Sequence, residues 1–162
     1  MTAVPGKKRA SRHFDSLPQE AFLNLWRTYD RLRDFEDALF GQYDLTPQQY
    51  NALRLLRGEY PDPLPTLALA SRLVSHAPDI TRMLDRLEAR ELVSRERPSD
   101  NRRVVHVKLT ESGVALLKEI DKPLRECHHN QLGHLSPTEL AELIRLLKLA
   151  RGPHEKDNSI WK

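Results

Sequence analysis

Residues 92–113 read LVSRERPSDNRRVVHVKLTESG and combine a short apolar start, a charged centre and a segment of alternating apolar residues. The alternation along Arg103–Leu109 predicts a β-strand with one apolar face, and Leu92–Arg95 predicts the strand opposite it. Serine, aspartate and asparagine in the centre favour a turn between the two strands. The stretch therefore predicts a β-hairpin with an arginine-bearing tip, a shape typical of a wing that contacts DNA.

Helical spacing of apolar residues surrounds this hairpin on both sides. Capping residues set the expected starts: Thr46 and Ser136 each open a capping box with proline at the first helical position, while Thr66, Ser75 and Thr110 open further helices. Gly58 is expected to end a helix in the left-handed conformation, and Pro123 predicts a kink or break. The predicted helices cover residues 18–42, 46–58, 67–74, 75–90, 110 to at least 127, and 137–151.

The charge distribution of the 162-residue chain indicates a polyanionic partner. Residues 1–13 hold four basic and no acidic side chains, and residues 72–108 hold nine basic and six acidic ones, against a net charge of +3. The simpler alternative is a solvated charged surface. No apolar run approaches the roughly 20 residues of a membrane span, so we expect no membrane association. The single cysteine, Cys127, fits a reducing, cytoplasmic setting.

Two adjacent predicted helices with almost no linker, followed by the hairpin, indicate a winged helix-turn-helix. The second helix of that motif enters the major groove of DNA, where Arg82 suits a guanine edge and Pro78 a thymine methyl group. Asp79 is expected to accept from cytosine or to orient Arg82. The candidate DNA-contacting residues are Ser75, His76, Pro78, Asp79, Thr81, Arg82, Arg86, Asp100, Asn101, Arg102 and Arg103.

Three other interpretations compete with DNA binding. The helix carrying Arg82, Asp85, Arg86 and Glu88 could be only an exposed face laced with ion pairs. A winged-helix module that binds an acidic protein would use the same arginines. An enzyme is not expected, because the sequence has no nucleophile–base constellation, glycine-rich phosphate loop or paired acid motif.

Several motifs together resemble the MarR family of bacterial transcriptional regulators over about residues 18–150. They are Leu45-Thr46-x-x-Gln49-Tyr50-x-x-Leu53, Leu69-Ala70-x-x-Leu73, Thr81-Arg82-x-x-Asp85-Arg86-Leu87-Glu88, Leu92-Val93-x-Arg95, Asp100-x-Arg102 and Leu109-Thr110-Glu111-x-Gly113. The resemblance implies a mainly α fold with a small β-hairpin wing, in which N- and C-terminal dimerisation helices flank the winged helix-turn-helix. It implies a homodimer on a pseudo-palindromic operator, with Arg102 in the minor groove and Asp100 orienting it.

The resemblance also implies a domain organisation and a mode of control. A flexible basic tail (1–16) precedes the domain (17–152), whose DNA-binding lobe covers about 46–110 and whose dimerisation helices cover about 18–42 and 111–151; a C-terminal tail (153–162) follows. We expect a repressor of nearby genes that a small ligand releases. Three residues depart from the family pattern: Glu91 replaces a usual glycine, Asn101 a common basic residue, and Pro78 stiffens the recognition helix.

The ligand site is weakly marked in the sequence. Trp26, Tyr29, Tyr43 and Tyr50 could line an aromatic pocket, although aromatic residues at helical spacing more often belong to a core. Metal or oxidant control of the same fold is the alternative. It has little support, because Cys127-His128-His129 with His134 matches no strong zinc spacing. A reactive thiol also needs an electropositive, accessible setting. We therefore predict no cofactor and no metal.

Overall fold

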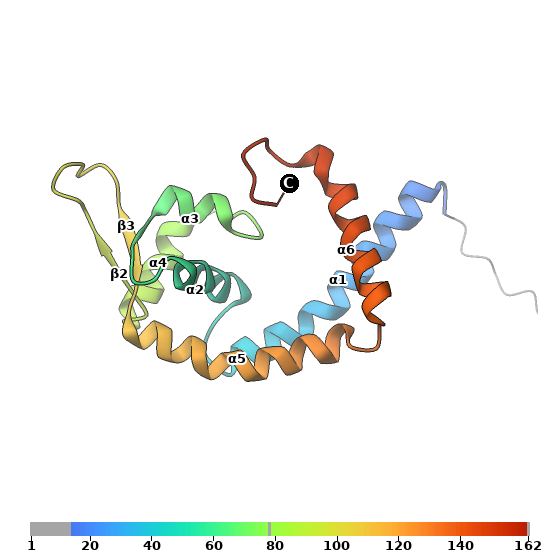
Figure 1. The fold of residues 1–162 in the computed structure, drawn as a ribbon, viewed down its shortest axis with the longest axis horizontal. Coiled ribbons are helices and arrows are strands. Elements are labelled where there is room, and N and C mark those ends of the chain that lie inside the picture. The colour runs from blue at the N-terminus through green and yellow to red at the C-terminus, as the bar shows by residue number, and fades with distance from the viewer. Residues whose placement is uncertain (1–13, 78, 162) are drawn as a thin grey trace, which may run out of the picture. The chain divides into compact units, whose positions relative to one another are not determined.

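The computed structural model describes residues 14–77 and 79–161 of the chain (Figure 1). Most of the predicted basic tail, and Pro78, lie outside the described residues. The elements are α1 (Leu17–Gly41), α2 (Pro47–Glu59), β1 (Leu64–Pro65), α3 (Thr66–Arg72), α4 (Ile80–Ala89), β2 (Val93–Glu96), β3 (His106–Leu109), α5 (Glu111–Leu132), α6 (Pro137–Arg151) and the 3-10 turn η1 (Gly152–His154). In the described part of the chain, no helix is long and apolar enough to cross a lipid bilayer.

The chain divides into two units, residues 1–34 and residues 35–162. In the first unit the structure describes the start of α1, where large apolar side chains stay exposed. Phe22 and Trp26 are each 61% exposed, and their rings lie 6.2 Å apart at a tilt. The second unit contains the end of α1 and all the other elements.

Helix α2 begins as the sequence predicts. The Thr46 side chain accepts a hydrogen bond from the backbone N–H of Gln49, and the Gln49 side chain accepts one from the backbone N–H of Thr46. The predicted end at Gly58 is wrong, because the helix continues to Glu59 and Gly58 does not have a positive φ. The prolines that follow, rather than a left-handed glycine, end this helix.

The wing is a three-stranded antiparallel sheet in the order β1-β3-β2, where the sequence predicts two strands. Val93 pairs with Leu109 and Glu96 with His106, which confirms the predicted hairpin, although its second strand begins at His106 and not at Arg103. The additional strand is short and contains a proline: Leu64 pairs with Val107 and Pro65 with His106. Proline is tolerated here because β1 lies at the edge of the sheet.

The two helices of the helix-turn-helix start differently from the prediction. Thr66 does not cap α3, since its hydroxyl donates to the Val105 carbonyl oxygen at 3.0 Å and so ties the helix to the wing. Ser75 does not open α4, which begins at Ile80 after a linker over residues 73–79. Asp79 supplies the cap instead, because its carboxylate accepts from the backbone N–H of Arg82 at 2.9 Å.

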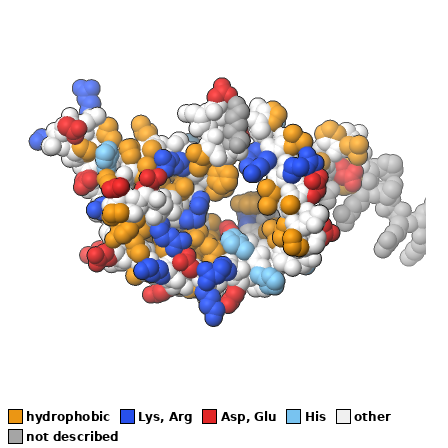
Figure 2. All heavy atoms as spheres, in the orientation of Figure 1, with side chains coloured by type: hydrophobic (Ala, Val, Ile, Leu, Met, Phe, Trp, Pro, Cys, Tyr) orange, Lys and Arg blue, Asp and Glu red, His pale blue; other side chains and the backbone are white. Residues whose placement is uncertain are grey.

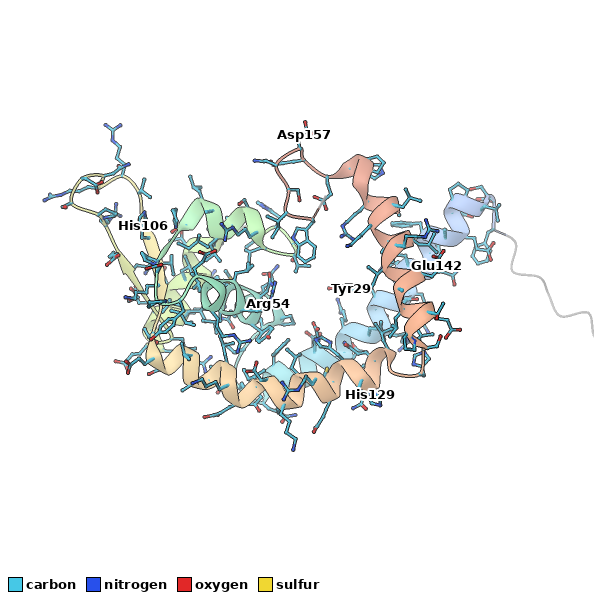
Figure 3. All side chains as sticks on the ribbon, in the orientation of Figure 1. Tyr29, Arg54, His106, His129, Glu142 and Asp157 are labelled. Carbon is cyan, nitrogen blue, oxygen red and sulfur yellow. The ribbon has the colours of Figure 1, made fainter. Side chains whose placement is uncertain are left out.

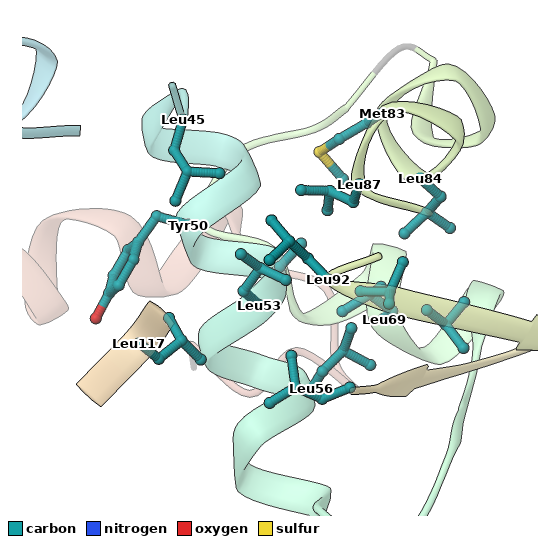
Figure 4. Packing of buried hydrophobic residues seen from close by; sticks show 14 of the residues in the cluster. Leu45, Tyr50, Leu53, Leu56, Leu69, Met83, Leu84, Leu87, Leu92 and Leu117 are labelled. Carbon is teal, nitrogen blue, oxygen red and sulfur yellow. The ribbon is translucent and has the colours of Figure 1, made fainter. Parts of the chain in front are cut away.

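One apolar core joins α2, α3, α4 and the wing to the end of α1 and to α5 (Figure 4). Leu53 and Leu56 of α2 are fully buried at its centre, as are Leu69 of α3 and Leu87 of α4. At the other side of α2, the rings of Phe40 and Tyr50 stack 4.5 Å apart. Burial of these side chains stabilises the lobe by about 1.5–3 kcal/mol for each large aliphatic residue.

The last two helices confirm their predicted caps. Thr110 accepts from the backbone N–H of Gly113 at 3.0 Å, and Ser136 forms a capping box with Glu139. Helix α5 continues through Pro123 rather than breaking there. Helix α6 has no buried residue, which distinguishes it from α2, α4 and α5.

Candidate nucleic-acid interface

Helix α4 has an apolar face and a charged face. Met83, Leu84 and Leu87 are buried in the core. The opposite face is exposed and carries Thr81, Arg82, Asp85 and Arg86. The helix therefore presents two arginines of the predicted recognition surface to solvent.

The turn before α4 is held by side chains of α2. The Gln48 side-chain amide donates to the Ser75 hydroxyl at 3.1 Å, and the Asn51 side-chain oxygen accepts from the backbone N–H of Val74 at 3.0 Å. Ser75 and His76 are exposed in this linker, so they lie near the helix start but not on the helix. Gln48 and Asn51 were not predicted, because only the folded chain brings them to the turn.

Asp79 has a structural role that the sequence analysis did not assign. Its carboxylate accepts from the Arg82 backbone and offsets the unpaired donors at the helix start. The expected contact of this carboxylate with the Arg82 side chain is not formed in the described structure. Capping is worth about 0.5–2 kcal/mol, which accounts for an acidic residue at a surface expected to face phosphates.

Arg95 on β2 forms an ion-pair cluster with the carboxylates of α4. Its Nε and one terminal nitrogen donate to Glu88 Oε2 at 2.9 and 2.6 Å, and its backbone N–H donates to Glu88 Oε1 at 2.9 Å. The same terminal nitrogen contacts Asp85 at 2.5 Å. These bonds hold the pKa of Glu88 below its ordinary value, with the side-chain bond to Arg95 as the largest cause.

The arginines of α4 are not part of that cluster. Among the described residues, Arg82 and Arg86 form no ion pair, while Asp85 and Glu88 are both engaged by Arg95. The alternative of an exposed face laced with ion pairs therefore accounts for the acidic side chains of α4 but not for its arginines. No sequence spacing signals the cluster, because Arg95 comes from a strand after the helix end.

The connection between α4 and β2 passes through a left-handed residue. Glu91 has φ of 58°, the conformation for which the family pattern uses glycine. Arg90, just before it, donates to the carbonyl oxygens of Asp44 and Tyr43 at 2.6 and 3.0 Å. The end of the recognition helix is thereby fixed to the turn after α1.

The wing tip carries basic side chains in solvent (Figure 2). Arg102 and Arg103 are exposed, and Asn101 accepts from the Arg103 backbone at 3.3 Å. No ion pair joins Asp100 to Arg102 in the described structure. Instead, the Arg97 guanidinium donates to the Arg102 carbonyl oxygen at 2.9 Å, a bond across the loop that the sequence did not indicate.

The four aromatic candidates fall in different surroundings. Trp26 and Tyr29 belong to the first unit and are 61% and 64% exposed on α1. Tyr43 is half-buried against the core of the second unit, where Tyr50 is 8% exposed and stacked on Phe40. Burial raises the pKa of the Tyr50 hydroxyl. Packing therefore accounts for Tyr50.

The cysteine and histidine candidates are spread along α5 and beyond it, and Figure 3 shows His129 near the end of α5. Cys127 is 7% exposed, and burial raises the pKa of its thiol, with a smaller contribution from Glu36. His128 contacts the Gln131 side-chain oxygen at 2.9 Å, whereas His129 and His134 are exposed. No group of three or more acidic, histidine or cysteine side chains within the described residues is placed to hold a metal ion.

Comparison with known proteins gives consistent matches. The MarR family model matches residues 45–105, from the turn before α2 to the wing. The crystal structure of a MarR transcription factor from Planctomyces limnophilus is 56% identical, with a TM-score of 0.68, and the match covers 85% of this chain and 99% of that one.

Two further matches extend over most of the chain. The transcriptional repressor MprA of Escherichia coli is 28% identical over 144 residues, which are 88% of this chain and 82% of that protein. A mutant MarR from E. coli, crystallised with operator DNA, is 24% identical with a TM-score of 0.71, and the match covers 83% of this chain and 94% of that one. This last likeness shows the fold alone.

Proposed function

The chain belongs to the MarR family of transcriptional regulators, and from this premise we propose that it is a homodimeric repressor of nearby genes that a small ligand releases from its operator. Membership makes it a DNA-binding regulator and not an enzyme. The observation that carries the proposal is the set of exposed arginines on α4 and the wing tip, with no acidic partner within the described residues. DNA phosphates and guanine edges are the partners that such arginines fit.

All the predicted contact residues except Pro78 and Asp79 have a place in this proposal. Arg82 and Arg86 on α4 enter the major groove, with Thr81 beside them, and Ser75 and His76 contact the backbone from the linker. Arg102 enters the minor groove, where negative potential is enhanced. Asp100, Asn101 and Arg103 flank it, and the orientation of Arg102 by Asp100 stays a prediction for the DNA-bound state.

Selection of bound duplexes from a random pool, followed by titration at several salt concentrations, tests DNA binding. Binding to the selected duplex should weaken steeply with salt, since phosphate contacts release counterions. Arg102→Ala should weaken binding to all duplexes. Arg82→Ala should cost about 1–3 kcal/mol and relax the base preference at one position. Arg125→Ala, at an exposed arginine of α5, is the control that should bind like the parent.

The homodimer is supported by apolar side chains that a single chain leaves in solvent. On α6 these include Ile144 and Leu149, which are 53% and 65% exposed, and on α1 Tyr29 is 64% exposed. Large apolar side chains that stay exposed in one chain are typical of an interface. Sedimentation should give about twice the 18.8 kDa of one chain, and Leu149→Glu should shift it towards the monomer. A monomeric parent at micromolar concentration would contradict the proposal.

Release by a small aromatic ligand is supported only by the exposed Trp26 and Tyr29. A panel of phenols and aromatic carboxylates, added to the complex with the selected duplex, tests it. We expect at least one compound to displace DNA from the parent and to fail with Trp26→Ala.

Repression is tested with a reporter under the neighbouring promoter. Deletion of the gene should raise expression of the reporter, and a fall in expression would indicate an activator.

A further inference from the structure

The ion-pair cluster of Arg95 joins two elements of the proposed interface. Arg95 lies on β2 of the wing, while Glu88 and Asp85 lie one turn apart on α4. The Arg95 side chain is 24% exposed, Glu88 37% and Asp85 55%. Asp85 is therefore the outermost member, closest to the solvent that DNA would displace.

Glu88 makes most of the contacts that hold Arg95 in place. It accepts from both the backbone N–H and the guanidinium of Arg95, at 2.6 to 2.9 Å. Such paired, charge-assisted bonds are about twice as strong as neutral ones. Asp85 adds one contact, from a terminal nitrogen that also donates to Glu88, to the three hydrogen bonds that Glu88 accepts from Arg95.

The helix geometry shows what the Asp85 contact prevents. Residues three apart on a helix face each other and readily form ion pairs. Asp85 is three residues after Arg82, so its natural partner within α4 is the arginine assigned to a base contact. Glu88 is six residues after Arg82, so it is not placed to form the same ion pair with Arg82 along the helix. In the structure Arg82 and Asp85 are not paired, because Asp85 points to Arg95.

We propose that Arg95 is a positioning residue for base recognition: by holding Asp85, it keeps the Arg82 guanidinium free for DNA. The inference rests on the proposed DNA-binding function and adds a second purpose to a cluster that also fastens the wing. Arg95 itself does not contact the base in this scheme. Its effect on binding passes through Asp85 and Arg82.

The test uses full-length variants titrated with the selected duplex. Arg95→Met keeps the apolar stem and should weaken binding about tenfold, on the scale of one lost arginine–base contact. It should also relax the same base position that Arg82→Ala relaxes. Adding Asp85→Asn to Arg95→Met should restore most of the affinity and the base preference, because no carboxylate remains to capture Arg82.

A matched control separates this mechanism from wing anchoring and from general charge. Arg95→Met with Glu88→Gln also removes one negative charge, but it leaves Asp85 able to pair with Arg82, so binding should stay weak. Glu88→Gln alone leaves the contact of Asp85 to Arg95 in place, so it should keep the base preference of the parent and lose less affinity than Arg95→Met. If Arg95→Met does not fold by circular dichroism, Arg95→Gln, which has no charge to hold Asp85, replaces it in the same series.

Three results would overturn the inference. The first is unchanged binding by the folded Arg95 variant, and the second is equal rescue by Asp85→Asn and Glu88→Gln. The third is a loss of affinity in Glu88→Gln as large as that in the Arg95 variant. Failure of the parent to bind any duplex is a different result, because it would remove the proposed function itself along with the inference.

Discussion

Helices α4 and α6 are both amphipathic, yet only α4 buries its apolar face within one chain. Its Leu84 and Leu87 are at most 1% exposed, whereas no residue of α6 is buried and Leu149 is 65% exposed. The difference separates a lobe that completes its own core from a helix whose apolar residues stay exposed in one chain. Similar sequence patterns thus serve folding in one place and, in the proposed dimer, assembly in the other.

The largest expected effect comes from Leu53→Ala in the core of the lobe. Leu53 is fully buried, so the substitution should lower the free energy of unfolding by about 2–5 kcal/mol. Leu149→Ala is the matched control and should leave the urea unfolding of the dilute monomer nearly unchanged. A large loss of unfolding free energy in Leu149→Ala under those conditions would contradict the distinction between the buried core of the lobe and the exposed face of α6.

Gly113→Ala tests how tightly the lobe packs where α5 meets the wing. An added Cβ would collide with the backbone oxygen of Leu92 and with the Leu109 side chain. Since a backbone oxygen cannot swing aside, we expect a loss of about 1–3 kcal/mol. Gly41→Ala at the end of α1, where nothing lies within 4 Å of the added atom, should cause no loss; equal losses in urea titration would refute the difference.

A gain in stability is expected from Glu91→Gly between α4 and β2. The left-handed φ of 58° costs a residue with a side chain about 1–2 kcal/mol. Part of that is offset by the greater freedom of glycine in the unfolded chain, so the net gain should be about 1 kcal/mol or less. Calorimetry should show a higher Tm. A lower Tm would mean that Glu91 has a contact that compensates for its strain.

The smallest effect concerns the pH dependence of the α4–wing contact. Arg95 lowers the pKa of Glu88 below 4.5, so the unfolded chain takes up this proton at a higher pH than the folded one. The pair therefore contributes fully above about pH 4.5, and its contribution is lost as pH falls through the lowered pKa. The free energy of unfolding, measured by urea titration at several values between about pH 7 and pH 3, should change less with pH in Glu88→Gln than in the parent. The same pH dependence in both proteins would count against the pair.

Local signals in the sequence predicted most of the fold. Thr46, Thr110 and Ser136 cap their helices through bonds to backbone N–H groups three residues later, so both partners are visible in a short window. The alternation of apolar residues in the wing likewise predicted which side chains of β3 are buried. The start of α4 was misplaced because Ser75 and Asp79 are both good caps, and only packing selects between them.

The site was predictable in part. The exposure of Arg82 and Arg86 follows from helical spacing, because the apolar positions of α4 determine its buried face. Strand β1 and the Arg95 cluster were missed, since each depends on residues brought together by the fold. The Asp79 cap was missed for a similar reason. The sequence shows that Asp79 is charged, but not that its carboxylate accepts a hydrogen bond from the backbone N–H of Arg82.

The position of β1 has a consequence for how such a regulator can change its target. β1 ends at Pro65 and β2 begins at Val93, and both flank β3 in one sheet. Neighbouring strands are about 4.8 Å apart, and Pro65 and Val93 pair with residues three apart on β3, so the segment between them leaves and returns at points roughly 14 Å apart. An exchange of residues 66–92 for another recognition segment would therefore have to keep both Glu88, which holds Arg95, and the apolar side chains by which α3 and α4 share the core with α2.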